Sequence, residues 1–171
     1  MDYRQPMITA SLVAKVQEQI ERTIHLVGLV PAEQIQWTPP IAGVWSVSEV
    51  LGHLLECLAG FCAVLYAAYP DRLSHFAELR NLPVNHACLP DKARTRLELY
   101  SRRLDEGFAL LTDLDLDRRL PTVFVPDGET ILTLLLGNLE HLINHKHQLF
   151  LYLRLMSVPV SSADLYRFRG E

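Results

Sequence analysis

The sequence predicts an all-α fold, a four-helix bundle. Four long segments carry apolar residues at spacings of three and four, few segments alternate as strands do, and turn-forming residues separate the four segments. Amphipathic helices of this kind bury their apolar faces by packing helix on helix. The 171 residues suffice for one hydrophobic core. We therefore expect residues 1–171 to form a single domain.

The first helix is predicted from about Thr9 to Val27, because five apolar residues form one stripe: Val13, Val16, Ile20, Ile24 and Val27. Gly28 and Pro31 end it. The loop that follows contains Trp37 and Trp45. We expect both tryptophans to cover one end of the core, and an aromatic lid over a site is the alternative.

The second helix has a capping box in Ser46 and Glu49, and its apolar run continues to about Tyr69. Residues 71–90 read as a connection that includes a short helix near residues 73–80. This connection is the longest in the chain. The pattern alone therefore leaves a bundle with a crossover and a simple up-down bundle both open.

The third helix is predicted over residues 91–114, and residues 120–129 are expected to be irregular or briefly extended. Thr130 is the predicted N-cap of the fourth helix, which runs to about Met156. Beyond Pro159 we expect a short, frayed tail. Two aromatic residues of this tail could still dock on the bundle: Tyr166 and Phe168.

The charge pattern argues against nucleic-acid binding. The formal net charge is −4, the pI is about 6.0, and the basic residues of the third helix alternate with acidic ones. Two apolar windows, residues 50–69 and 131–156, are long enough to suggest a membrane helix. Both contain histidines and charged residues, which are costly in a bilayer. We expect buried bundle helices and no membrane segment.

The three cysteines, Cys57, Cys62 and Cys88, are odd in number and form no C-x-x-C motif. A disulfide framework is therefore not expected, which favours a reducing compartment. The N-terminal residues lack the apolar stretch of a signal peptide. We expect a cytoplasmic protein.

The fourth helix carries the chemistry. His141 and His145 are four residues apart, a spacing that places two imidazoles on one helix face where they can share a metal ion. The motif is not H-E-x-x-H, because Leu142 stands where that motif has its glutamate. A polar stripe continues along this face: Asn138, His141, His145, Gln148 and Tyr152.

A third ligand should come from another helix, and His53 is the candidate. Alone in its apolar run it would be interpreted as a hydrogen-bonded core histidine, but beside the histidine pair it is favoured as a ligand. A thiolate at Cys57 is a weaker alternative to a buried, inert cysteine. The remaining histidines are expected to be structural or surface residues: His25, His75, His86 and His147.

Three histidines leave open coordination positions, as in catalytic zinc sites. Zinc or nickel is favoured as the divalent metal, and iron, manganese or cobalt would also accept imidazoles. The histidine tautomers need hydrogen-bond acceptors to fix them. Four residues are candidates for this role: Glu49, Glu56, Asn138 and Gln148.

Two segments resemble the signatures of the DinB-like/YfiT-like superfamily. Residues 45–54 resemble its second helix, in which a tryptophan and a small capping residue precede a metal-binding histidine. Residues 141–154 resemble its last helix, with two histidines four apart, a basic residue, Gln-Leu and Tyr-Leu-Arg. One departure is that Asn144 precedes the last ligand position and Lys146-His147 follow it. The resemblance covers roughly residues 10–158.

This resemblance implies a four-helix bundle with a long crossover between the second and third helices. It also implies a three-histidine divalent metal site at His53, His141 and His145, and a homodimer. Related families include metal-dependent transferases and isomerases that use low-molecular-weight thiols, and a hydrolase. The family name refers to DNA damage and implies no DNA binding.

Three functional interpretations follow. The first is a metal-dependent thiol S-transferase or hydrolase that acts on a small molecule, with a low-molecular-weight thiol as the expected partner. The second is a metal-binding or ligand-binding bundle without turnover, which the missing H-E-x-x-H glutamate keeps open. The third is a metal-free structural bundle. Catalytic residues other than the metal ligands are not identifiable from the sequence.

Overall fold

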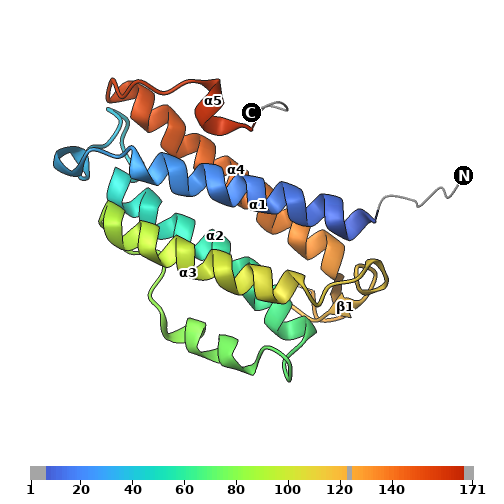
Figure 1. Cartoon of the computed structure of the whole chain (residues 1–171). Coiled ribbons are helices and arrows are strands. Elements are labelled where there is room, and N and C mark those ends of the chain that lie inside the picture. Colours follow the sequence, from blue (N-terminus) through green and yellow to red (C-terminus); the bar gives the residue numbers. More distant parts are fainter. Residues whose placement is uncertain (1–6, 123–124, 168–171) are drawn as a thin grey trace, which may run out of the picture.

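The computed structural model describes residues 7–122 and 125–167, which form a four-helix bundle (Figure 1). Helix α2 contacts α3 on one side and α4 on the other, and α1 contacts the same two helices. The all-α prediction is confirmed. The four long helices are α1 (Ile8–Gly28), α2 (Val47–Ala68), α3 (Pro90–Phe108) and α4 (Ile131–Leu155).

Short elements join these helices. The 3-10 helices are η1 (Ala32–Gln34), η2 (Ser74–Asn81) and η3 (Asp113–Asp115), and a short helix α5 (Ser162–Leu165) follows α4. Strands β1 (Arg119–Leu120) and β2 (Glu129–Thr130) form one antiparallel pair before α4. The long crossover between α2 and α3 is confirmed, and η2 lies within it at the edge of the bundle (Figure 1).

The predicted helix starts match the structure. The Ser46 hydroxyl accepts a hydrogen bond from the Glu49 backbone N–H, and the Glu49 carboxylate accepts one from the Ser46 backbone N–H, which completes the capping box. The Thr130 hydroxyl accepts from the backbone of Thr133 at the start of α4. Each cap satisfies backbone N–H groups that the first helical turn leaves without partners.

Helix α3 ends at Phe108, six residues earlier than the sequence pattern predicts. The apolar spacing continues beyond this point, but Thr112 and Asp115 form a new capping box and start η3. A side-chain oxygen that bonds local backbone N–H groups competes with continuation of the helix. The chain therefore turns at residues 109–111 toward β1.

Of the tail, residues 160–167 pack on the bundle and are not frayed. Its helix α5 begins with a capping box, and the carbonyl of its last residue, Leu165, accepts a hydrogen bond from the buried Lys146 ammonium at 2.8 Å. His25 of α1 lies 2.7 Å from Asp164. These polar contacts hold the segment against α1 and α4. Of the two aromatic residues expected to dock, Tyr166 lies near the Lys146 ammonium, and Phe168 is outside the described residues.

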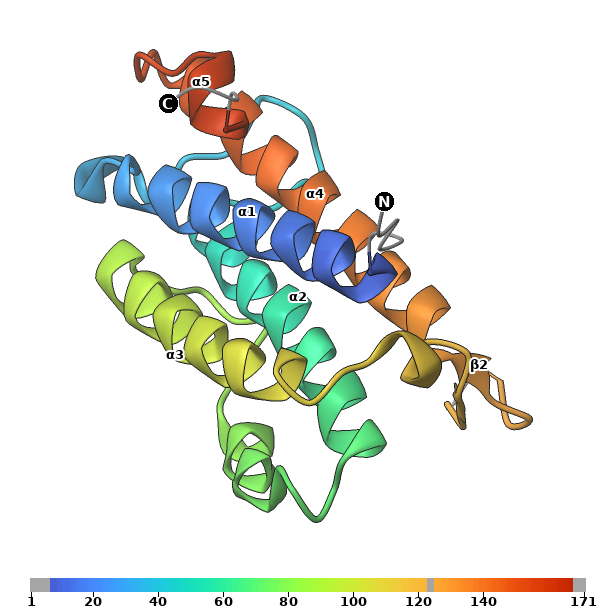
Figure 2. The same cartoon turned by 45° about the vertical axis from the view of Figure 1, so that its right-hand side comes forward.

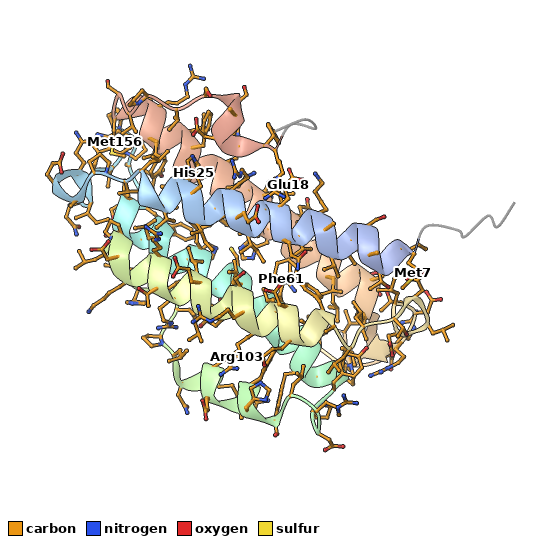
Figure 3. The ribbon with its side chains drawn as sticks, viewed as in Figure 1. Met7, Glu18, His25, Phe61, Arg103 and Met156 are labelled. Atoms are coloured by element: carbon orange, nitrogen blue, oxygen red, sulfur yellow. The ribbon has the colours of Figure 1, made fainter. Side chains whose placement is uncertain are left out.

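Helix α2 is the central helix of the core. Phe61, on this helix, is fully buried between the others (Figure 3). Among the described residues, α2 alone is long and apolar enough to span a membrane, but 61% of its most apolar window is buried inside the bundle. The apolar run is thus the run of a core helix.

The three cysteines are free and buried. Burial raises the pKa of both Cys57 and Cys62 to about 12. A thiol with so high a pKa is protonated at neutral pH and is therefore a poor nucleophile and metal ligand. Cys57 is thus a small core residue, as its sequence context favours.

Candidate metal centre

Three histidines from two helices meet at one point of the bundle. His53 lies on the second turn of α2, and His141 and His145 lie on successive turns of α4. Helix α4 contacts both α2 and α1, and Figure 2 shows it crossing beside α1. Gly60 of α2 leaves room for the side chain of Asn138, which projects from α4. A Cβ atom there would lie 2.4 Å from the Asn138 amide oxygen.

The imidazole nitrogens lie at distances that one metal ion can bridge. The Nε2 atom of His53 lies 2.9 Å from that of His141 and 3.1 Å from that of His145. All three ligating atoms lie within 4.8 Å of one another. Two metal–nitrogen bonds of about 2.05 Å at a tetrahedral angle separate the nitrogens by roughly 3.3 Å. The cluster thus fits a divalent ion bound by three histidines.

The hydrogen bonds on the far side of two rings define which nitrogen carries the proton. The Nδ1 atom of His53 lies 2.6 Å from the Asn85 amide oxygen and 3.2 Å from the Glu56 carboxylate. The Nδ1 atom of His145 lies 2.8 Å from the Gln148 amide oxygen. Because these oxygens only accept, each Nδ1 must donate. Each neutral ring therefore directs the lone pair of Nε2 into the cluster.

The surroundings disfavour a positive charge on the two histidines of α4. Burial lowers the pKa of His141 and of His145, and a positive charge on His53 would lower both further. At neutral pH these rings are unprotonated. The Nε2 lone pairs of His53 and His145, whose Nδ1 atoms both donate outward, face one another at 3.1 Å and repel unless a cation lies between them. A proton is disfavoured by the lowered pKa values, so a metal cation is the group that this arrangement suits.

Asn85, which the sequence analysis missed, is held by the crossover connection. Its backbone N–H donates to the carbonyl of Gly52 at 3.1 Å, and its φ of 54° lies in the left-handed region that asparagine tolerates. The connection can approach α2 this closely only at a glycine, because a Cβ at Gly52 would lie 1.7 Å from the carbonyl oxygen of His86. The sequence alone does not reveal the contact of Asn85 or the close approach at Gly52, because both depend on where this segment crosses α2.

Trp45 covers the histidine cluster. Its ring centroid lies 4.6 Å from that of His53 and 5.6 Å from that of His145. Beside it a pocket of about 350 Å³ is lined by Trp45, Glu49, His53 and Asn85. Trp37 instead packs against the ring of Tyr152. Trp45 thus lies over the candidate site, where the lid interpretation places an aromatic ring, and Trp37 packs against the core.

Of the four residues expected to fix the histidine tautomers, Gln148 and Glu56 contact a ring. Asn138 instead donates to the carbonyl of Leu134. Glu49 lines the pocket and accepts hydrogen bonds from the backbone N–H and hydroxyl of Ser46. These hydrogen bonds lower the pKa of Glu49, so the pocket holds an ionised carboxylate.

The other four histidines lie apart from the cluster. His25 pairs with Asp164, and His75 pairs with Glu106. His147 is exposed and its ring stacks with that of Phe150. His86 lies in the crossover connection beside α3.

A sequence model described as the DinB superfamily matches residues 15–149. The comparison with curated proteins gives no match. Two solved structures are similar over nearly their whole length. One is a DinB-like protein, YjoA, from Bacillus subtilis, with 20% identity, a TM-score of 0.67 and coverage of 92% of this chain and 99% of that one. The other is assigned to the DinB family, from Exiguobacterium sibiricum, with 25% identity, a TM-score of 0.63 and coverage of 90% and 94%.

A third structure is a point mutant of a mycothiol-dependent maleylpyruvate isomerase, with 14% identity and a TM-score of 0.59. The alignment covers 87% of this chain and 63% of the isomerase. At this level of identity the likeness concerns the fold. The family match covers well over half of the sequence, includes His53, His141 and His145, and agrees with the four-helix bundle and its crossover. The chain belongs to the DinB superfamily.

Proposed function

We propose that this protein is a divalent-metal-dependent enzyme whose metal ligands are His53, His141 and His145. The observation that carries the proposal is the convergence of the three Nε2 atoms, two of which are oriented by acceptors on the far side of their rings. Zinc or nickel is the favoured metal. Iron, manganese or cobalt would be compatible with the same nitrogen ligands.

A divalent ion held by three histidines retains open coordination positions, where it lowers the pKa of a bound water or thiol and so supplies a nucleophile. The protein side chains do the rest. Asn85 and Gln148 fix the rotation and tautomer of two ligands. The indole of Trp45 shields one side of the cluster from water. The pocket beside it gives a small substrate access to His53.

An acidic residue at the pocket favours an enzyme over a passive metal-binding bundle. Glu49 lines the pocket, and its hydrogen bonds with Ser46 keep it ionised and hold its carboxylate in place. The same hydrogen bonds lower its pKa and make it a weak base, so it takes a proton only from a nucleophile that a bound metal would itself make more acidic. Glu49 is therefore our candidate general base, in a role that the missing H-E-x-x-H glutamate would otherwise play.

Two reaction classes remain, and thiol S-transfer is our first choice. It is supported by family membership and by the likeness in fold to an isomerase whose name states that it depends on mycothiol. Hydrolysis is the second candidate, because a water that a bound metal would make acidic can pass its proton to the same pocket carboxylate as a thiol can. In both classes the substrate is a small molecule, given a pocket of about 350 Å³.

The test uses protein loaded with cobalt(II), whose visible spectrum reports coordination geometry. We expect a low-molecular-weight thiol, such as cysteine or 2-mercaptoethanol, to produce the intense near-ultraviolet absorption of a cobalt–thiolate bond. His53→Ala should abolish it, whereas His147→Ala, an exposed histidine on the same helix as two of the ligands, should not.

The same proteins are then assayed for transfer of the thiol to an electrophile and for ester hydrolysis, with Glu49→Gln as the test of the base. Loss of turnover in Glu49→Gln with unchanged metal content supports the enzyme. Metal binding with neither thiol coordination nor turnover of either class would contradict it and would favour the non-catalytic binding protein.

Three expectations belong to the same proposal: one domain, a cytoplasmic location and a homodimer. The homodimer is supported by exposed apolar residues along α4, which are 37–47% accessible although they lie on a core helix: Leu136, Ile143 and Leu151. Light scattering should give twice the chain mass, and Leu151→Lys should shift it to the monomer. A monomer at all concentrations would contradict the dimer.

A further inference from the structure

A second cavity lies away from the histidine site, between α2 and the crossover connection. Its volume is about 410 Å³, within the ~300–1,000 Å³ range of small-molecule sites. One wall is formed by three alanines of α2, Ala59, Ala63 and Ala67, at successive helical turns. The opposite wall includes Phe76 and Leu79 of η2. No residue of this lining also lines the pocket at His53.

The connection is held in place at both ends, so the cavity is a built feature of the fold. Phe76 is 2% exposed, and His75 beside it pairs with Glu106 of α3 at 2.7 Å. At the other end, the backbone of Asn85 is bonded to Gly52 of α2. Between these anchors η2 spans the alanines, whose methyl groups are too short to fill the space.

The cavity lining includes one charged residue, Arg80 of η2. It belongs to none of the ion pairs formed within residues 7–122 and 125–167, and its side chain is exposed. Its guanidinium lies over the ring of Tyr66, 4.8 Å from the centroid. An aromatic face positions the guanidinium and leaves its N–H donors available to an anion.

We propose that this cavity binds a small apolar molecule that carries one anionic group, of the aryl or short alkyl carboxylate class. The apolar body lies against the alanines of α2 and the side chains of η2, which removes apolar surface of both from water. The carboxylate meets Arg80 at the rim. Arginine matches the planar geometry of a carboxylate with two parallel hydrogen bonds.

The test uses two fluorescent probes that share one ring skeleton. 8-Anilinonaphthalene-1-sulfonate carries an anionic group, and N-phenyl-1-naphthylamine lacks it. Metal-free protein is titrated with each, so the result does not depend on the proposed metal chemistry. We expect both probes to bind with a rise in fluorescence. The anionic probe should bind about fivefold more tightly through the Arg80 contact, the scale of one exposed ion pair.

Ala63→Phe should weaken binding of both probes at least about tenfold, because the ring occupies the cavity. Ala63 is exposed, so the helix can accept the larger side chain. Circular dichroism and the melting temperature serve as checks that the variant folds. Ala10→Phe, at an exposed position of α1, is the matched control and should leave binding unchanged.

Arg80→Gln should remove the preference for the anionic probe and leave binding of the neutral probe unchanged. Arg72→Gln, at an exposed arginine of the same connection, is its control. Binding that survives Ala63→Phe would place the probes elsewhere on the protein and overturn the proposal. An equal affinity for the two probes in the unaltered chain would overturn the claim that Arg80 binds an anionic group.

Discussion

Removing the amide of Asn85 should weaken metal binding without unfolding the protein. In Asn85→Gly the ring of His53 loses the acceptor at 2.6 Å and keeps only the Glu56 carboxylate at 3.2 Å. Loss of such a hydrogen bond typically lowers metal affinity about 10- to 100-fold. Because Glu56 partly substitutes, we expect the lower limit, about tenfold or ~1.4 kcal/mol.

Glycine is the right replacement here because the φ of residue 85 is 54°, which glycine adopts without strain. The backbone hydrogen bond to Gly52 is also retained. Asn85→Asp keeps an acceptor of the same length and should hold metal at least as tightly as the unaltered chain. Asn81→Gly, at the end of η2, is the control for flexibility of the connection.

The assay is competition with a colorimetric chelator at neutral pH, with the unfolding midpoint in urea recorded for each variant. An Asn85→Gly affinity equal to that of the unaltered chain would refute the positioning argument. So would an Asn85→Asp affinity as low as that of Asn85→Gly.

Three further predictions concern stability. Ser46→Ala removes the N-cap of α2 and should lower the unfolding free energy in urea by about 1 kcal/mol; an unchanged value would contradict the cap's role. Gly52→Ala should both destabilise the chain and weaken metal binding, because its Cβ meets a backbone carbonyl of the connection, whereas Gly137→Ala, with open space around its Cβ, should not. Burial lowers the pKa of Lys146 to about 8 from 10.5. Between these pH values the unfolded chain binds more protons, so stability should rise with pH relative to Lys146→Met; parallel curves would refute this.

Much of the fold could be predicted because local signals and the global packing agree. The capping box at Ser46 and the N-cap at Thr130 start their helices where the apolar spacing begins. The predicted end of α3 is wrong. The spacing of apolar residues continues past Phe108, but the side-chain cap at Thr112 and Asp115 competes with the helix and stops it. The docked tail was missed because its contacts, such as that between Lys146 and Leu165, join segments that are apart in the sequence.

The clustering of the three candidate ligands could be predicted from the sequence, but their surroundings could not. His141 and His145 follow from helical spacing, and His53 becomes the third candidate only because that pair is present in the same chain. Asn85 and the lid position of Trp45 depend on where two irregular segments cross α2. Periodicity carries no information about the path of such segments.

The most direct test of the account is the metal content of protein purified without added metal or a histidine tag. We predict close to one divalent ion per chain, lost in His53→Ala, His141→Ala and His145→Ala and retained in His147→Ala. Contradiction would come from unaltered protein that holds no metal even after dialysis against zinc or nickel, or from metal that remains when the three histidines are replaced together.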